Sequence, residues 1–148
     1  MTLLPFRCHP LLKSRVWGGE RLLEWNKPLP GGATNRWGES WEFADLPKDI
    51  PDGRSIIRDG PLAGQNFQDA MVQHAPALMG DLPRSPHGGF PLLVKLLDAQ
   101  RNLSVQVHPT AEYAEAHPGA YKKDEAWLIL DAQPDSLLYA GLADGVTP

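Results

Sequence analysis

Glycine and proline set the strongest limit on what this chain can fold into. They account for 29 of its 148 residues and divide the apolar sequence into short segments. Proline cannot continue a helix interior or donate a hydrogen bond within a sheet, and glycine weakens both kinds of element. The pattern therefore favours many short strands and a mainly β fold over an all-helical bundle. Five Trp, four Phe and three Tyr supply the large apolar surfaces that a disordered chain lacks.

The length and charge of the chain narrow its class further. We expect residues 1–148 to form a single domain segment, since a chain of this length builds one modest core. The net charge is −4 and no window is rich in Lys or Arg, which argues against a nucleic-acid partner. The longest apolar stretch, residues 90–97, is interrupted by Lys95 and is too short to cross a membrane. With Cys8 as the only cysteine, we expect a soluble cytoplasmic protein without a membrane partner.

Hydrophobic periodicity predicts most of the elements. A helix is expected to begin after Asn66 and end at Gly80, and a second, short helix to follow Thr110 as its N-cap. The first 35 residues contain so much proline and glycine that we expect little regular structure there. The expected strands are short and bounded by turn residues: 37–43, 54–58, 91–97, 103–108, 125–130 and 137–140.

A polar strand face carries the first candidate site. In an extended segment over residues 103–108, Ser104, Gln106 and His108 share one face and the apolar residues share the other. The Gln carbonyl oxygen and a His ring nitrogen two positions apart can both bind a divalent metal. A solvent-exposed strand face explains the pattern equally well. Gln-x-His alone is therefore a weak signal.

Glu125 adds a carboxylate at the start of the next strongly apolar segment. Together with Gln106 and His108 it gives an oxygen, nitrogen and oxygen donor set, which suits zinc, manganese or iron. The alternative is an ordinary ion pair between Glu125 and Lys122 or Lys123.

Lys95 lies inside an apolar run that otherwise requires burial. An unpaired buried ammonium would lose its charge or destabilise the fold, so Lys95 needs a partner. Asp98, three residues further on, belongs to the other face of a strand. Two interpretations stay open: Lys95 extends to the edge of the sheet, or its charge faces an anion-binding cavity.

Six segments of the chain match the sequence motifs of one known family and occur in the same order. They are 16–19 (VWGG), 38–42 (GESWE), 60–64 (GPLAG), 90–99 (FPLLVKLLDA), 103–109 (LSVQVHP) and 123–127 (KDEAW). On these segments the chain resembles the class I mannose-6-phosphate isomerases, or phosphomannose isomerases, in their short bacterial form. The resemblance covers nearly all of the chain, and the block from 90 to 109 is specific.

The resemblance implies a cupin-type, jelly-roll-like β-barrel with one or two short helices. It implies one Zn²⁺ per chain, with Gln106, His108 and Glu125 as the metal ligands. The family's fourth ligand, a His, and further catalytic residues lie well downstream of the Lys-x-Glu strand, whereas this chain stops at Pro148. We therefore expect an incomplete barrel, the N-terminal part of the catalytic domain, with the fourth ligand outside this segment or replaced by water.

The remaining roles also come from the resemblance. Lys95 and Ser104 match the residues near the substrate phosphate, and Lys123 matches a catalytic lysine near the reacting carbons. The family interconverts mannose 6-phosphate and fructose 6-phosphate, a reaction through a cis-enediol that requires a base, a group that polarises the carbonyl and a grip on the phosphate.

Other functions and partners remain open at this point. One alternative is a non-catalytic cupin module that binds a sugar or sugar phosphate, and another is a cupin of different chemistry, such as a non-haem iron oxygenase. The expected partner is a small-molecule sugar phosphate. An open sheet edge also invites a homodimer or a strand swap with a second copy.

Overall fold

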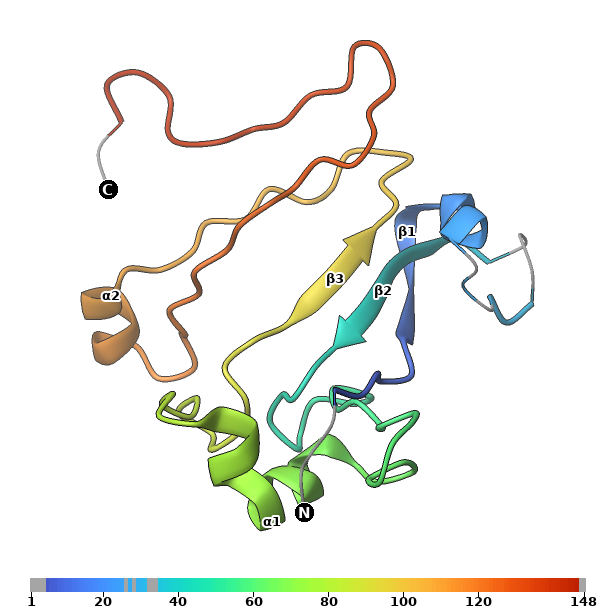
Figure 1. Cartoon of the computed structure of the whole chain (residues 1–148). Coiled ribbons are helices and arrows are strands. Elements are labelled where there is room, and N and C mark those ends of the chain that lie inside the picture. Colours follow the sequence, from blue (N-terminus) through green and yellow to red (C-terminus); the bar gives the residue numbers. More distant parts are fainter. Residues whose placement is uncertain (1–4, 26, 28, 32–34, 147–148) are drawn as a thin grey trace. The chain divides into compact units, whose positions relative to one another are not determined.

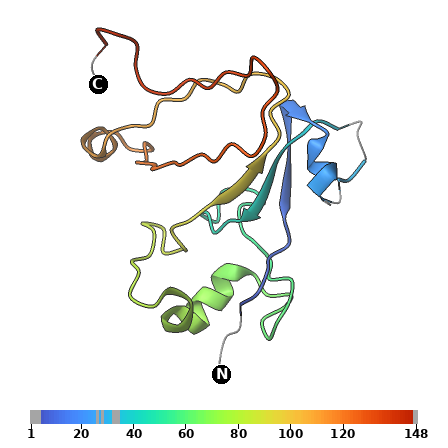
Figure 2. The same ribbon diagram turned by 45° about the horizontal axis from the view of Figure 1, so that its top comes forward.

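Figures 1 and 2 show the computed structural model of the chain, in which residues 5–25, 27, 29–31 and 35–146 are described. The chain divides into two compact units, Met1–Ser104 and Val105–Pro148. All of the strands formed by these described residues lie in the first unit. None of the helices in the described ranges is long and apolar enough to span a membrane.

A three-stranded antiparallel sheet organises the first unit, with the central strand β2 paired to both neighbours (Figure 1). The predicted strand at 37–43 is confirmed as β2. Of the strand predicted at 91–97, only the last four residues pair with β2, because the sequence pattern identifies apolar residues and not their backbone partners. The strands are β1 (Leu11–Gly19), β2 (Trp37–Phe43) and β3 (Val94–Leu97).

The register of the sheet brings two lysines, a glutamate and a tryptophan to one face. Lys13 of β1 lies opposite Glu39 of β2, and Trp41 of β2 lies opposite Lys95 of β3. Side chains two residues apart on a strand share a face, so Glu39 and Trp41 point the same way. Cations from both outer strands therefore flank the central strand on this face.

The expectation of little regular structure before residue 35 is wrong. β1 is the longest strand, and a 3-10 helix, η1 (Arg21–Trp25), follows it. Gly18 suits the crossing of two strands, because a Cβ there would lie 2.5 Å from the backbone nitrogen of Gly38. Glycine in this segment allows close backbone approach and does not end the strand.

The predicted helix is confirmed as α1 (Phe67–Met79). The Asn66 side chain caps it by accepting a hydrogen bond from the Gln68 backbone N–H at 2.9 Å, and Gly80 ends it. One feature departs from the prediction: the helix is kinked at His74, with φ −128°. Pro76 lies two residues later and lacks the N–H that a continuous helix would use.

The hydrophobic core lies between α1 and the segments around it, beyond the end of β2 (Figures 1 and 2). Four phenylalanines join this core through ring contacts, the closest of which is an edge-on contact of Phe43 with Phe67 at 4.6 Å between centroids. The buried members of the core are Ile57, Leu62, Phe67, Ala70, Met71 and Met79.

The predicted strand at 54–58 is replaced by isolated bridges. Arg54, Ile56 and Ile57 each pair with a different segment of the chain. Because the three residues bridge to three separate segments, no continuous ladder of hydrogen bonds forms. The segment instead connects the loops around the core.

The second unit departs most from the expected fold. Its helix α2 (Ala111–Ala116) is confirmed, with the Thr110 hydroxyl accepting the Tyr113 N–H at 3.2 Å. The strands expected at 103–108, 125–130 and 137–140 do not form. A strand requires the backbone of a neighbour, and the described residues supply none to these segments. The observed architecture is a small antiparallel sheet with two α-helices and no closed barrel among the described residues.

Candidate functional site

Three of the predicted site residues meet within the second unit. The His108 Nε2 lies 3.3 Å from Glu125 Oε2, and the Lys123 Nζ donates a hydrogen bond to Glu125 Oε1 at 3.1 Å. One carboxylate therefore joins a histidine on one oxygen and a lysine on the other. Both interpretations of Glu125, the ion pair with Lys123 and the shared site with His108, have a counterpart in this geometry.

The His108 ring nitrogen is the most informative atom of this group. Nε2 is inaccessible to solvent and has no hydrogen-bond partner among the described residues, although Glu125 Oε2 lies close by. Buried polar atoms normally find a partner, so an unpartnered one indicates a missing group. Two donor atoms that share a tetrahedral zinc ion at 2.0 to 2.2 Å lie about 3.3 to 3.6 Å apart. The His108–Glu125 separation fits that arrangement.

Gln106 is not drawn into the cluster by any contact. Its side chain is exposed, and within the described chain it makes no hydrogen bond to His108 or Glu125. No group of three His, Cys, Asp or Glu side chains comes together among the described residues. The donor set available in this unit is thus His108 and Glu125, with Gln106 two residues from the histidine along the chain.

In the first unit, Lys95 finds its partner in Glu39 and not in Asp98. The Lys95 Nζ lies 3.7 Å from Glu39 Oε2 and 5.1 Å from the centroid of the Trp41 ring. Asp98 instead accepts the Arg21 backbone N–H at 2.6 Å. The side chain of Lys95 is 23% exposed, so its ammonium is neither fully buried nor free in solvent.

The buried carboxylate of Glu39 accepts hydrogen bonds from Arg15 and Trp41. Arg15 donates from Nε and Nη2 to its two oxygens at 3.1 and 3.2 Å, and the Trp41 indole N–H donates to Oε2. Burial alone raises the pKa of Glu39, but the hydrogen bonds from Trp41 and Arg15 and the charges of Lys95 and Arg15 outweigh it and hold the pKa below its ordinary value. The carboxylate stays ionised at neutral pH.

As a result, the charge of Glu39 attracts Lys95, but the N–H groups of Lys95 remain available to a ligand. Its Nζ makes no hydrogen bond with the part of the chain that the structure describes. A lysine ammonium has three N–H groups that can rotate toward a ligand. Ser104, the other residue expected near phosphate, is exposed and likewise makes no hydrogen bond to any described residue.

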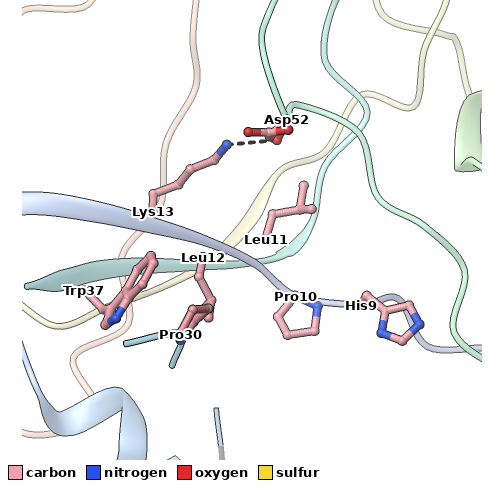
Figure 3. A pocket seen from close by; sticks show the side chains of 8 residues that line it. All are labelled: His9, Pro10, Leu11, Leu12, Lys13, Pro30, Trp37 and Asp52. Atoms are coloured by element: carbon pink, nitrogen blue, oxygen red, sulfur yellow. Dashed lines mark hydrogen bonds between the residues drawn. The ribbon is translucent and has the colours of Figure 1, made fainter. Parts of the chain in front are cut away.

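Lys13 borders an open depression of about 390 Å³ beside β1 (Figure 3). Its Nζ donates to the backbone oxygen of Asp52 at 3.0 Å and of Pro51 at 3.4 Å, and lies 4.7 Å from the Trp41 ring centroid. In Figure 3 its side chain extends toward Asp52, on the side of the strand away from Leu12.

Sequence reasoning did not single out Lys13, Arg15 or Glu39. A signal for Glu39 was present, since it stands two residues before Trp41 and so shares its face in a strand. No comparable signal existed for the two cations, because β1 was not expected and its register with β2 is a tertiary feature.

Comparison with known proteins identifies the family. Residues 5–133 match the family model of the catalytic domain of phosphomannose isomerase type I, and the chain belongs to this family. It is 37% identical over 142 residues to the mannose-6-phosphate isomerase ManA of Bacillus subtilis, a match that covers 95% of this chain and 42% of the relative. It is 39% identical over 140 residues to the probable mannose-6-phosphate isomerase GmuF of the same organism, covering 93% of this chain and 41% of the relative.

A solved structure supports the fold. The crystal structure of the mannose 6-phosphate isomerase from Bacillus subtilis matches with a TM-score of 0.60 and 28% identity, covering 76% of this chain and 32% of that chain. The likeness confirms the expected fold class, an incomplete cupin-type architecture. The chain spans about two fifths of the length of the curated relatives it matches.

Proposed function

We propose that this chain is part of a mannose-6-phosphate isomerase that interconverts mannose 6-phosphate and fructose 6-phosphate. Membership of the phosphomannose isomerase type I family supports the reaction class. The observation that carries the proposal for the site is the His108–Glu125 pair, whose buried ring nitrogen lies 3.3 Å from a carboxylate oxygen without a hydrogen bond. This is the arrangement expected of two ligands that share a metal ion.

Zinc is the proposed metal, with His108, Glu125 and Gln106 as the residues that hold it. The donors are one imidazole nitrogen and two oxygens, which suit zinc, and a water or a residue outside this chain completes the set. When bound, zinc supplies Lewis-acid polarisation of a sugar oxygen.

Lys123 has two proposed tasks that follow from one contact. Its hydrogen bond to Glu125 Oε1, at 3.1 Å, holds the carboxylate so that Oε2 stays toward His108. Its remaining N–H groups can donate to the sugar oxygen that becomes negative when a proton leaves the adjacent carbon. The proton moves between C1 and C2 through a cis-enediol, and Lys123 stabilises the charge that develops.

Lys95 and Ser104 are the proposed phosphate ligands. Lys95 offers an ammonium whose N–H groups no described residue accepts, and Ser104 offers an exposed hydroxyl. Charged donors to phosphate are stronger than neutral ones. This local attraction matters because the chain as a whole carries a net charge of −4.

The first test measures metal content by mass spectrometry in the purified chain, prepared without chelators. We expect near-stoichiometric zinc in the unmodified chain and its loss in His108→Ala. His117→Ala is the matched control, because this exposed histidine lies in the same unit and contacts Tyr113, not Glu125. Equal zinc content in both variants would contradict the ligand assignment.

The second test measures turnover. The chain is joined to the part of Bacillus subtilis ManA that it does not cover, and conversion of mannose 6-phosphate is followed by proton exchange in deuterated water. Conversion that Lys123→Ala abolishes supports the isomerase. Binding of the sugar phosphate without turnover would favour a non-catalytic sugar-phosphate module, and iron with oxygen consumption would favour an oxygenase.

A further inference from the structure

We infer that Lys13 is a second cation of the phosphate site, so that Lys13 and Lys95 together hold the phosphate dianion of the substrate beside the Trp41 ring. The inference rests on the proposed function, which supplies the phosphorylated sugar. It adds a residue to which sequence reasoning gave no role, on a strand that was not expected.

The charged side chains near Trp41 carry a net positive charge, because three cations, Lys13, Arg15 and Lys95, share one carboxylate, Glu39. Arg15 and Glu39 neutralise each other through a two-point hydrogen-bonded pair at 3.1 and 3.2 Å. Lys13 forms no ion pair with any described side chain; its contacts are to two neutral backbone oxygens. Lys95 lies 3.7 Å from a carboxylate that Arg15 already neutralises. A phosphate monoester carries a charge of roughly −1.5 to −2 at neutral pH, which matches the two positive charges that remain among Lys13, Arg15 and Lys95 once Glu39 is counted.

The positions of the two ammonium groups agree with a shared ligand. They come from the two outer strands and approach the same indole ring on the central strand, at 4.7 Å for Lys13 and 5.1 Å for Lys95. The ring is itself fixed by the hydrogen bond from its N–H to Glu39. Each lysine has a flexible four-carbon stem, so both can close on a group that lies beside the ring.

The bonds of Lys13 permit this role. The backbone oxygens of Asp52 and Pro51 accept two of its three N–H groups and leave its charge uncompensated. The opposing explanation is that Lys13 only ties the turn at 51–52 to β1. The two explanations differ in one observable, because only a phosphate ligand changes the affinity for phosphate.

The test is a calorimetric titration of the 148-residue chain with inorganic phosphate and with mannose 6-phosphate at low salt. Lys13→Gln and Lys95→Gln are each expected to weaken phosphate binding by about tenfold, the loss of one charge-assisted hydrogen bond. Lys13→Arg is expected to retain most of the affinity, because it keeps the charge. Lys48→Gln removes an equal charge from an exposed position outside this face and is expected to change the affinity by less than about twofold.

Each outcome decides the inference. Unchanged affinity in Lys13→Gln with weakened affinity in Lys95→Gln removes Lys13 from the site and leaves the isomerase proposal standing. Equal weakening in Lys48→Gln reduces the effect to net charge and also overturns the inference, as does a chain that binds neither ligand. Failure of the proposed function is read separately, from zinc content and turnover. Thermal unfolding of each variant distinguishes lost affinity from lost folding.

Discussion

Glu39 shows how one buried carboxylate can fix several side chains without immobilising all of them. It accepts hydrogen bonds from Arg15 and Trp41, and it attracts Lys95 from 3.7 Å without hydrogen-bonding to it. A carboxylate with one cationic partner would hold that partner tightly and be difficult to separate from it. Here Arg15 forms the close hydrogen-bonded pair with Glu39, which leaves Lys95 oriented and its N–H groups available to a ligand.

The pH dependence of stability tests this account of Glu39. Its folded-state pKa lies below the ordinary value of 4.5, because hydrogen bonds and nearby cations outweigh burial. Its contribution is therefore complete above that value and is lost as the pH falls through the folded-state pKa. Glu39→Gln should unfold about 1 to 3 kcal/mol more easily at pH 7 and lose less stability on acidification.

Urea unfolding between pH 7 and pH 3 measures the effect. Glu24→Gln is the control, since Glu24 lies on the surface of η1 with its side chain 60% exposed. A parallel decline of the Glu39→Gln variant and the unmodified chain would contradict the lowered pKa.

Individual residues were predicted unevenly, for a physical reason. The need of Lys95 for a partner follows from the apolar sequence around it, and the structure supplies one. The identity of that partner does not follow, because Glu39 is 56 positions away along the chain and reaches Lys95 only through the β2–β3 register. The pairing of Glu125 with Lys123 is local in sequence and was foreseen as one of two interpretations.

Among the elements, the two helices differ in what their caps can contribute. α1 places Phe67, Ala70, Met71 and Met79 in the interior, whereas α2 buries no residue. An N-cap bond stabilises its helix by about 1 kcal/mol. Only where the helix is coupled to a core does that energy appear in the stability of the whole unit.

The N-caps therefore provide a matched pair of variants. Asn66→Ala should lower the free energy of unfolding by about 1 kcal/mol, and Asn66→Asp should restore it, because Asp also accepts the Gln68 N–H. Thr110→Ala should reduce helicity locally with a much smaller effect on global unfolding. Urea unfolding followed by circular dichroism measures both, and an equal loss in the two Ala variants would show that α2 is coupled to the core.

Strands proved harder to predict than helices. A helix satisfies its own backbone, so the spacing of apolar residues and the caps at Asn66 and Thr110 suffice to place it. A strand needs a second segment, which the local pattern does not contain. That is why β1 was missed behind its glycines and why the apolar segment 125–130 was expected to be a strand but is not one.

At the level of the whole chain, regular structure is concentrated in the first unit. The second unit has one helix of six residues, and apolar side chains at 127–130 are 48 to 82% exposed. Exposed apolar segments of this kind are typical of surfaces that pair with another segment. A homodimer or strand swap through them stays a prediction.

Hydrogen exchange tests the distinction between the units and the metal proposal together. Amides of β1, β2 and α1 should be protected, whereas those of 121–130, which make no described backbone hydrogen bond, should exchange rapidly. Zinc should slow exchange around His108 and Glu125, and magnesium serves as the control ion. Protection of 121–130 without zinc would contradict the structure, and no response to zinc would contradict the metal site.

The placement of aromatic residues gives the molecule two separate optical reporters. All four phenylalanines join the α1 core, whereas none of the five tryptophans is among its described members, and two lysine ammonium groups lie 4.7 and 5.1 Å from the Trp41 ring centroid. Indole emission responds to nearby charge, so a phosphate that draws Lys13 and Lys95 away from the ring changes the signal of Trp41. The near-ultraviolet bands of phenylalanine follow the core instead. Ligand binding and loss of packing can thus be recorded in one unlabelled sample at different wavelengths.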